Sequence, residues 1–258
     1  MANGSFGWLL AYITSCWAME CNDFIFVERN WALDKAVLSD ACDHYADLNA
    51  KYQILLFPEG TDLQPKSIAR SNLFAENHGL PKYNHVLHPR TTGFVHIVQM
   101  MAKSGCLDCI YDIDIAYPES IVSSELAFAK GQTPEAISFN VRRYSVSELP
   151  PLDDPDALTS WCGDRWSEKE LRLKAFYEAP PGARHFPGHR RGILRGPGLW
   201  LTLAFWFGNL SLWLWALFST WWALIYVVGV SVLYTVIGRL YGGLERWEIF
   251  LWKRKLDW

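Results

Sequence analysis

The spacing of apolar positions predicts three helices between residues 31 and 103. Apolar residues recur near helical spacing over 31–50, with Asp and Lys between them. A second helix is predicted over 66–78, where Gly79 and Pro81 end it, and a third over 91–103, closed by Ser104 and Gly105.

Four shorter runs predict strands. "DFIFV" (23–27) and "YQILLF" (52–57) are continuously apolar, and the second is expected to be buried on both faces. The runs at 109–117 and 136–146 alternate apolar and polar residues, as half-buried strands do. Strand, helix and strand in succession over 23–57 indicate a parallel sheet, so we expect an α/β fold in which a mixed sheet is flanked by helices.

After the last predicted strand the chain continues with a partly amphipathic helix and then becomes strongly apolar. The helix is predicted over 156–178 despite Gly163, and a segment rich in Gly and Pro follows it. From 198 to 238 no Lys, Arg, Asp, Glu or His occurs, a run about twice the ~20 residues of one membrane span. We therefore expect a C-terminal transmembrane helical hairpin with its turn at 218–220.

Basic residues on both sides of the hairpin predict its orientation. They are Arg184, Arg190, Arg191 and Arg195 before it, and Arg239, Arg246, Lys253, Arg254 and Lys255 after it. The positive-inside rule then places both ends in the cytoplasm. A buried hairpin of a soluble protein and a single span with a re-entrant segment are the alternatives. The apolar stretch at 6–19 is short for a span and lacks the features of a signal peptide, which favours a buried or interfacial helix.

Composition excludes some functions. Half of the 258 residues are hydrophobic and the net charge is −3, so bulk charge does not indicate nucleic-acid binding. The six cysteines are scattered and form one CxxC pair, Cys106 and Cys109. With no second pair and no nearby His pair, we expect reduced packing thiols and no metal site.

The most informative chemical signal is "FPEGT" at 57–61, where an apolar run ends in a carboxylate and a turn. In open α/β sheets ligands bind at the carboxyl ends of strands, which is where Glu59 is expected to lie. Gly60 would let a substrate approach the backbone closely. A plain turn that closes a strand is the alternative interpretation.

Three ordered motifs resemble a known enzyme family. "FPEGT" is similar to the third motif of the glycerolipid acyltransferases related to lysophosphatidic acid acyltransferase, and most like the lysocardiolipin acyltransferase branch. "FIFVERNW" resembles the second motif, with Arg29 in the arginine position, and "VLHPRTTGF" the fourth, with Pro89 in place. The resemblance runs from about Gly7 to the C-terminal basic segment.

This resemblance implies acyl transfer from acyl-CoA to a hydroxyl of a lysophospholipid, with acyl-CoA as co-substrate and no cofactor. Arginine suits the acceptor phosphate because its guanidinium presents a planar fork of donors. A solvated helix face or an ion pair with Glu76 is the alternative for Arg70 and Arg90. Asp62 stands where many relatives carry Arg, which implies a different phosphate environment. The implied substrate-binding residues are Arg29, Phe57, Pro58, Glu59, Gly60, Thr61, Arg70, Pro89 and Arg90.

The family's general base is a His in the pattern H-x-x-x-x-D before the second motif, and no His of this chain has Asp or Glu five positions later. We therefore expect an N-terminally shortened form and assign no catalytic residue. His88, beside Pro89, is expected to be structural. An inactive membrane protein that still binds lysophospholipid and a nonfunctional fragment with an open sheet edge are the alternatives.

The expected organisation has five parts. These are an N-terminally incomplete acyltransferase domain (1–105), its C-terminal extension (106–183), a basic linker (184–197), the transmembrane hairpin (198–240) and a basic tail (241–258). We expect a multi-pass protein of the endoplasmic reticulum membrane, with mitochondria-associated membrane as an alternative. The sequence does not identify a protein partner.

Overall fold

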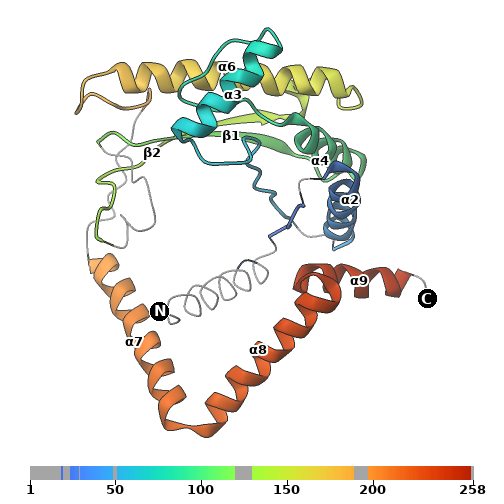
Figure 1. Ribbon diagram of the computed structural model, residues 1–258, viewed down its shortest axis with the longest axis vertical. Helices are drawn as coiled ribbons and strands as arrows, with labels where there is room; N and C mark the ends of the chain where they lie inside the picture. The colour runs from blue at the N-terminus through green and yellow to red at the C-terminus, as the bar shows by residue number, and fades with distance from the viewer. Residues whose placement is uncertain are drawn as a thin grey trace. The chain divides into compact units, whose positions relative to one another are not determined.

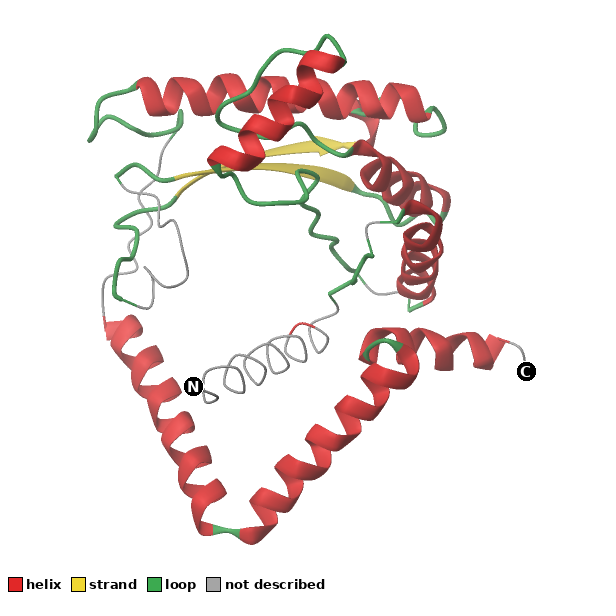
Figure 2. Cartoon of the chain, in the orientation of Figure 1, coloured by secondary structure: helices red, strands yellow, loops and turns green. Residues whose placement is uncertain are grey.

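Two compact units make up the chain in the computed structural model, which describes residues 19, 24–28, 30–48, 51–119, 130–188 and 197–256. One unit comprises residues 45–189, and the other combines residues 1–44 with residues 190–258. Helices predominate over strands among the described residues (Figures 1 and 2). The predicted helix at 6–19 lies outside these residues, apart from Met19.

The unit at 45–189 contains most of the elements that the sequence predicts. Its helices are α3 (Pro65–Asn77), α4 (Thr91–Lys103) and α6 (Pro155–Glu178), and its strands are β1 (Cys109–Ala116) and β2 (Ser138–Ser145), followed by the short 3-10 helix η1 (Val146–Glu148). These elements confirm the predicted helices at 66–78, 91–103 and 156–178 and the predicted strands at 109–117 and 136–146. The first predicted helix is also confirmed, as α2 (Trp31–Asp47).

The sheet is smaller than predicted. Within the described ranges, β1 and β2 are its two strands, and they pair antiparallel with Ile113 opposite Val141. The prediction of a strand at 52–57 buried on both faces is wrong, because this segment is not in a strand and Leu55 and Phe57 are 72% and 69% exposed. Residues 24–28 are not in a strand either. An apolar run becomes a strand only where a neighbour pairs with it, and the described residues offer none here.

The two faces of the sheet differ sharply. Along β1, Asp112 and Asp114 are buried on the face that α6 covers, whereas Ile113 and Ile115 are 40% and 45% exposed on the other face. The alternation follows from the two-residue period of a strand. Its polarity is the reverse of the usual one, because the carboxylates are inside and the isoleucines outside.

Local chemistry explains where α6 begins and why it is fixed. Asp154 caps its first turn by accepting hydrogen bonds from the amides of Asp156 (2.9 Å) and Ala157 (3.1 Å), and Pro155 occupies the first helical position. Two apolar clusters then bury one side of the helix. The first contains Tyr83, Val86, Ala116, Leu173, Phe176 and Phe186, and the second Phe94, Val95, Val98, Leu158 and Cys162. Trp166 packs against both clusters.

The other unit carries the apolar helices. They are α7 (Pro197–Ser219) and α8 (Trp221–Tyr241), and Thr220, within the predicted turn at 218–220, lies between them. Both are long and apolar enough to cross a membrane, and 0% and 6% of their most apolar segments are buried in the protein. This exposure disfavours the alternative of a buried soluble hairpin, because core helices are covered by their own protein.

A helix that the sequence analysis left as a tail follows α8. Gly242, with φ of +83°, ends α8 in the left-handed conformation that glycine adopts without strain, and α9 (Leu244–Leu256) begins two residues later. Lys253 of α9 forms an ion pair with Asp40 of α2 at 2.6 Å. The aromatic rings of His44 and Trp252 also meet, at a centroid distance of 5.3 Å.

Candidate functional site

Two of the three motifs meet in space within the unit at 45–189. The "FPEGT" segment forms a tight turn in which the amide of Gly60 donates to the carbonyl of Phe57 at 3.0 Å. The amide of Arg90 donates to the carbonyl of Pro58 at 2.8 Å. The segment that precedes α3 and the segment that precedes α4 are therefore joined at this turn.

Residues 83–90 form a loop whose amides are fully used. All seven residues with an amide hydrogen, which are all except Pro89, donate it. The acceptors lie on three parts of the unit. On α3, Asn72 accepts from Tyr83 and Ser71 from His88, and on α6, Glu170 accepts from Asn84, His85 and Val86. At the turn, Glu59 accepts from Leu87 and the carbonyl of Pro58 accepts from Arg90. Since no amide of this loop is free, an acidic ligand beside it must be held by side chains or by other backbone.

Glu59 is a bridging carboxylate. Its Oε2 accepts from the amide of Leu87 at 3.1 Å, and its Oε1 accepts from the indole nitrogen of Trp166 at 3.2 Å. Burial raises the pKa of Glu59, and the hydrogen bonds from Leu87 and Trp166 and the charge of Lys169 offset only part of this effect. The carboxylate thus joins the turn, the 83–90 loop and α6.

Arg90 is the cation nearest to the glycine of the motif. Gly60 has φ of +70°, and a Cβ placed on it would lie 3.7 Å from both Cδ and Nε of Arg90. The arginine side chain therefore lies along the turn, and Arg90 as a residue is exposed. Its five guanidinium donors suit a phosphate group in water-accessible surroundings.

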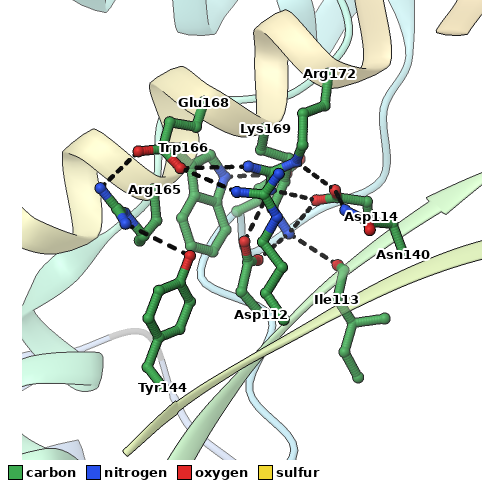
Figure 3. A network of polar contacts seen from close by, with 12 residues as sticks. Asp112, Ile113, Asp114, Asn140, Tyr144, Arg165, Trp166, Glu168, Lys169 and Arg172 are labelled. Carbon is green, nitrogen blue, oxygen red and sulfur yellow. Dashed lines mark hydrogen bonds and ion pairs between the residues drawn. The ribbon is translucent and has the colours of Figure 1, made fainter. Parts of the chain in front are cut away.

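A buried ionic network fixes α6 on the sheet (Figure 3). Arg172 donates to Asp114 Oδ2 through Nε at 2.7 Å and to Asp112 Oδ2 through Nη2 at 2.8 Å. Lys169 Nζ lies 2.7 Å from Asp112 Oδ1 and donates to the carbonyl of Ile113 at 2.8 Å. Burial alone raises the pKa of Asp114, but the hydrogen bonds from Arg172 and Asn140 outweigh it, so the pKa of Asp114 lies below its usual value.

The remaining predicted substrate-binding residues lie in different surroundings. Thr61 is exposed at the turn and donates to Asp62 at 3.0 Å, and Arg70 is exposed on α3. Glu76, the alternative partner considered for the arginines, forms an ion pair with Lys82 at 3.5 Å. Arg29 lies outside the described residues, so its part in the site stays a prediction.

His88 has the contacts of a structural residue. Its Nε2 lies 2.9 Å from the carbonyl of Pro81, and its ring stacks on Tyr83 at a centroid distance of 4.2 Å. A general base must reach the proton of the acceptor hydroxyl, and this nitrogen already faces a carbonyl.

Sequence reasoning missed Trp166 and Glu170 as parts of the site. Their spacing of four residues places them on the same face of α6 and was readable from the sequence. Nothing local, however, indicates which loop that face covers, because the partners Glu59 and Asn84 are 107 and 86 residues away. The partly amphipathic pattern over 156–178 predicts no more than apolar packing for a tryptophan at 166.

The described part of the chain brings no three His, Cys, Asp or Glu side chains together as a metal site. The described cysteines are free thiols. Burial raises the pKa of Cys162 to about 12, which makes this thiol unreactive at neutral pH.

Comparison with known proteins shows similarity to acyltransferases. Residues 128–207, which include β2 and α6, match the Acyltransferase C-terminus family. The chain is 39% identical over 242 residues to lysocardiolipin acyltransferase 1 of Mus musculus, covering 90% of this chain and 63% of that protein. It is 36% identical over 251 residues to lysophosphatidylinositol acyltransferase 10 of Caenorhabditis elegans, covering 91% of this chain and 62% of that protein. No solved structure matches the chain.

These matches confirm the resemblance to the glycerolipid acyltransferases that the motifs indicate. Among more distant relatives, 1-acyl-sn-glycerol-3-phosphate acyltransferase 2 of Arabidopsis thaliana is 28% identical over 74% of this chain and 52% of its own length. The chain spans 62% to 63% of the length of the mouse and nematode relatives.

Proposed function

We propose that this protein transfers an acyl group from acyl-CoA to a hydroxyl of a lysophospholipid, and that residues 57–61 and Arg90 bind the acceptor. The observation that carries the proposal is the meeting of two motifs at one turn. Pro58 and Glu59 bind the backbone of Arg90 and Leu87, and Arg90 lies over Gly60 with its guanidinium available to a phosphate. The names of the relatives, which act on lysocardiolipin and lysophosphatidylinositol, support a lysophospholipid acceptor.

In this proposal the described residues supply positioning and charge. Glu59 fixes the 83–90 loop, Gly60 allows close approach of the glycerol part, and Arg90 neutralises the acceptor phosphate. Holding the acceptor hydroxyl against the thioester lowers the barrier by replacing an encounter in solution with an oriented one. The hydroxyl oxygen attacks the thioester carbonyl while a base takes its proton, the C–S bond breaks, and the departing CoA thiolate takes up that proton.

Proton removal needs a general base, which the related family supplies as the His of an H-x-x-x-x-D pattern. These 258 residues contain no such pattern. This observation favours a second candidate function, a membrane protein that binds lysophospholipid without acylating it. Loss of a general base typically lowers the rate about 10²- to 10⁴-fold, whereas acceptor binding does not depend on it.

We also propose that α7 and α8 cross the bilayer as a hairpin with both ends in the cytoplasm, in the endoplasmic reticulum or a mitochondria-associated membrane. The length and apolar composition of both helices support the spans, and the basic residues in the last turn of α9 support the orientation. The site would then face a cytoplasmic pool of acyl-CoA.

The test is acylation of a panel of lysophosphatidic acid, lysophosphatidylinositol and monolysocardiolipin by the purified 258-residue chain in lipid nanodiscs. A version extended upstream through any native H-x-x-x-x-D is assayed beside it. Acylated product from either version supports the enzyme. Lysophospholipid binding without product from both supports the second candidate, and neither binding nor product overturns both.

A further inference from the structure

We infer that α6 positions the acceptor site through Trp166 and Glu170, so that the region matching the Acyltransferase C-terminus family acts as part of that site. The inference rests on the proposed function for the identity of the ligand, a lysophospholipid with an anionic phosphate. It assigns roles that the three motifs do not include. Both are positioning residues, because their contacts are to Glu59 and to loop amides.

Glu170 holds three consecutive amides with one carboxylate. Its Oε1 accepts from Asn84 at 2.9 Å, and its Oε2 accepts from His85 at 2.8 Å and from Val86 at 3.1 Å. Glu170 is itself buried, at 8% exposure. A buried carboxylate is stabilised by donors of this kind, and in turn it prevents the loop from turning those amides towards another anion.

Trp166 lies one turn before Glu170 on α6 and holds Glu59 by a hydrogen bond, as Glu170 holds the loop. Its ring packs against both apolar clusters of the unit, and its indole nitrogen donates to Glu59 Oε1. Lys169 Nζ lies 4.9 Å from the centroid of that ring. Lys169 is itself bound to Asp112 and to the carbonyl of Ile113 (Figure 3). The indole therefore contacts a fixed cation through its ring and the carboxylate of Glu59 through its nitrogen.

Together the two residues determine where Arg90 can present its charge. Glu59 holds Leu87 and Glu170 holds the three residues before it, so the path from residue 84 to Pro89 is set by α6 and the turn. Burial disfavours the charged form of Glu59, and its donors keep the carboxylate in place. Without the indole donor, the carboxylate of Glu59 loses one of its two hydrogen bonds, and the 83–90 loop loses the connection to α6 that runs through Glu59.

The experiment compares Trp166→Phe with Trp161→Phe in the 258-residue chain. Trp166→Phe keeps an aromatic ring but removes the donor to Glu59. The control removes an indole N–H from the same helix, where the ring stacks on Phe94 at 6.0 Å. Hydrogen exchange measured by mass spectrometry follows peptides that cover 83–90, and equilibrium binding follows a lysophospholipid and acyl-CoA separately. Glu170→Gln is the second variant.

We expect about tenfold faster exchange in 83–90 and about fivefold to tenfold weaker lysophospholipid binding for Trp166→Phe, from loss of one hydrogen bond to a charged group. Acyl-CoA binding should stay within about twofold, and Trp161→Phe should match the wild type in all three readouts. Glu170→Gln should have the same acceptor-specific effect, because its carboxamide presents N–H groups to amides that need an acceptor.

Three results would overturn the inference. Unchanged exchange in both Trp166→Phe and Glu170→Gln would show that these residues do not hold the 83–90 loop. Faster exchange with unchanged lysophospholipid binding would show that holding the loop does not affect acceptor binding. Equal weakening of acceptor and acyl-CoA binding indicates general loss of structure. A wild-type chain that binds no lysophospholipid refutes the proposed function instead, and the exchange measurement then decides separately whether α6 holds the loop.

Discussion

Arg172 is the residue whose loss should destabilise the unit at 45–189 most clearly. Its guanidinium contacts both Asp112 and Asp114, and Asp114 is 1% exposed. Arg172→Met keeps most of the side-chain volume but leaves two buried carboxylates with Lys169 as the remaining cation of the cluster. Removing one partner of a buried ion pair typically costs about 3–5 kcal/mol.

The matched control is Arg142→Met. Arg142 is 44% exposed in its side chain and pairs with Glu168 at 3.5 Å, a carboxylate that Arg172 also approaches. A surface pair of this kind contributes about 0–1 kcal/mol. The two variants therefore remove the same charge from neighbouring positions and differ in burial.

Thermal unfolding followed by circular dichroism in detergent micelles measures the difference. For a chain of this size about 2–4 °C corresponds to 1 kcal/mol, so Arg172→Met should lower the midpoint by roughly 6–20 °C and Arg142→Met by no more than about 4 °C. Equal midpoints for the two variants would refute the role assigned to the buried network.

Other expected outcomes concern pH and the phosphate site. Because the pKa of Asp114 is lowered in the fold, its stabilisation is present above the unfolded value of 3.8 and is lost as pH falls, and Asp114→Asn should flatten that part of an acid denaturation curve. Because the pKa of Glu59 is raised in the fold, its contribution to the free energy of unfolding is present below its unfolded pKa of 4.5 and is lost as pH rises through the folded pKa. Glu59→Gln should remove this pH-dependent loss of stability, which urea titrations at several pH values measure. Arg29→Ala should weaken lysophospholipid binding more than Arg184→Ala, which loses contacts to backbone carbonyls, and equal dissociation constants would contradict the placement of the phosphate.

The local part of the fold was predictable because it is written in short-range patterns. The bounds of α4 agree with the sequence prediction. The helical spacing of apolar residues begins after Arg90, and Ser104 and Gly105 end the helix. The alternation along β1 was also visible. The sequence of the strand did not indicate which of its two faces would be buried. The aspartate face is buried because Arg172, more than fifty residues later in the chain, binds it.

The failed prediction at 52–57 shows the limit of the same reasoning. Apolar β-branched and aromatic residues favour a strand, but a strand also needs a partner, and pairing is not a property of the segment itself. The helix α9 was missed because its basic residues were interpreted as a tail. Its contacts to Asp40 and His44 become apparent only in three dimensions.

The candidate site was partly predictable for a similar reason. "FPEGT" and the segment containing Pro89 stand out in the sequence, and the structure joins them through Pro58 and Arg90. The dependence of Glu59 on Trp166 could not be inferred, since a tryptophan in an amphipathic helix is ordinarily explained by apolar packing alone.

The most direct test of the account is equilibrium binding of a lysophospholipid to the purified 258-residue chain, with Arg90→Ala compared with Arg142→Ala. Both variants remove one exposed arginine from the unit at 45–189. The account predicts that Arg90→Ala weakens binding about tenfold or more, as expected for a lost charge-assisted hydrogen bond, while Arg142→Ala stays within about twofold of the wild type. Equal affinities of the two variants would contradict an acceptor site at the "FPEGT" turn.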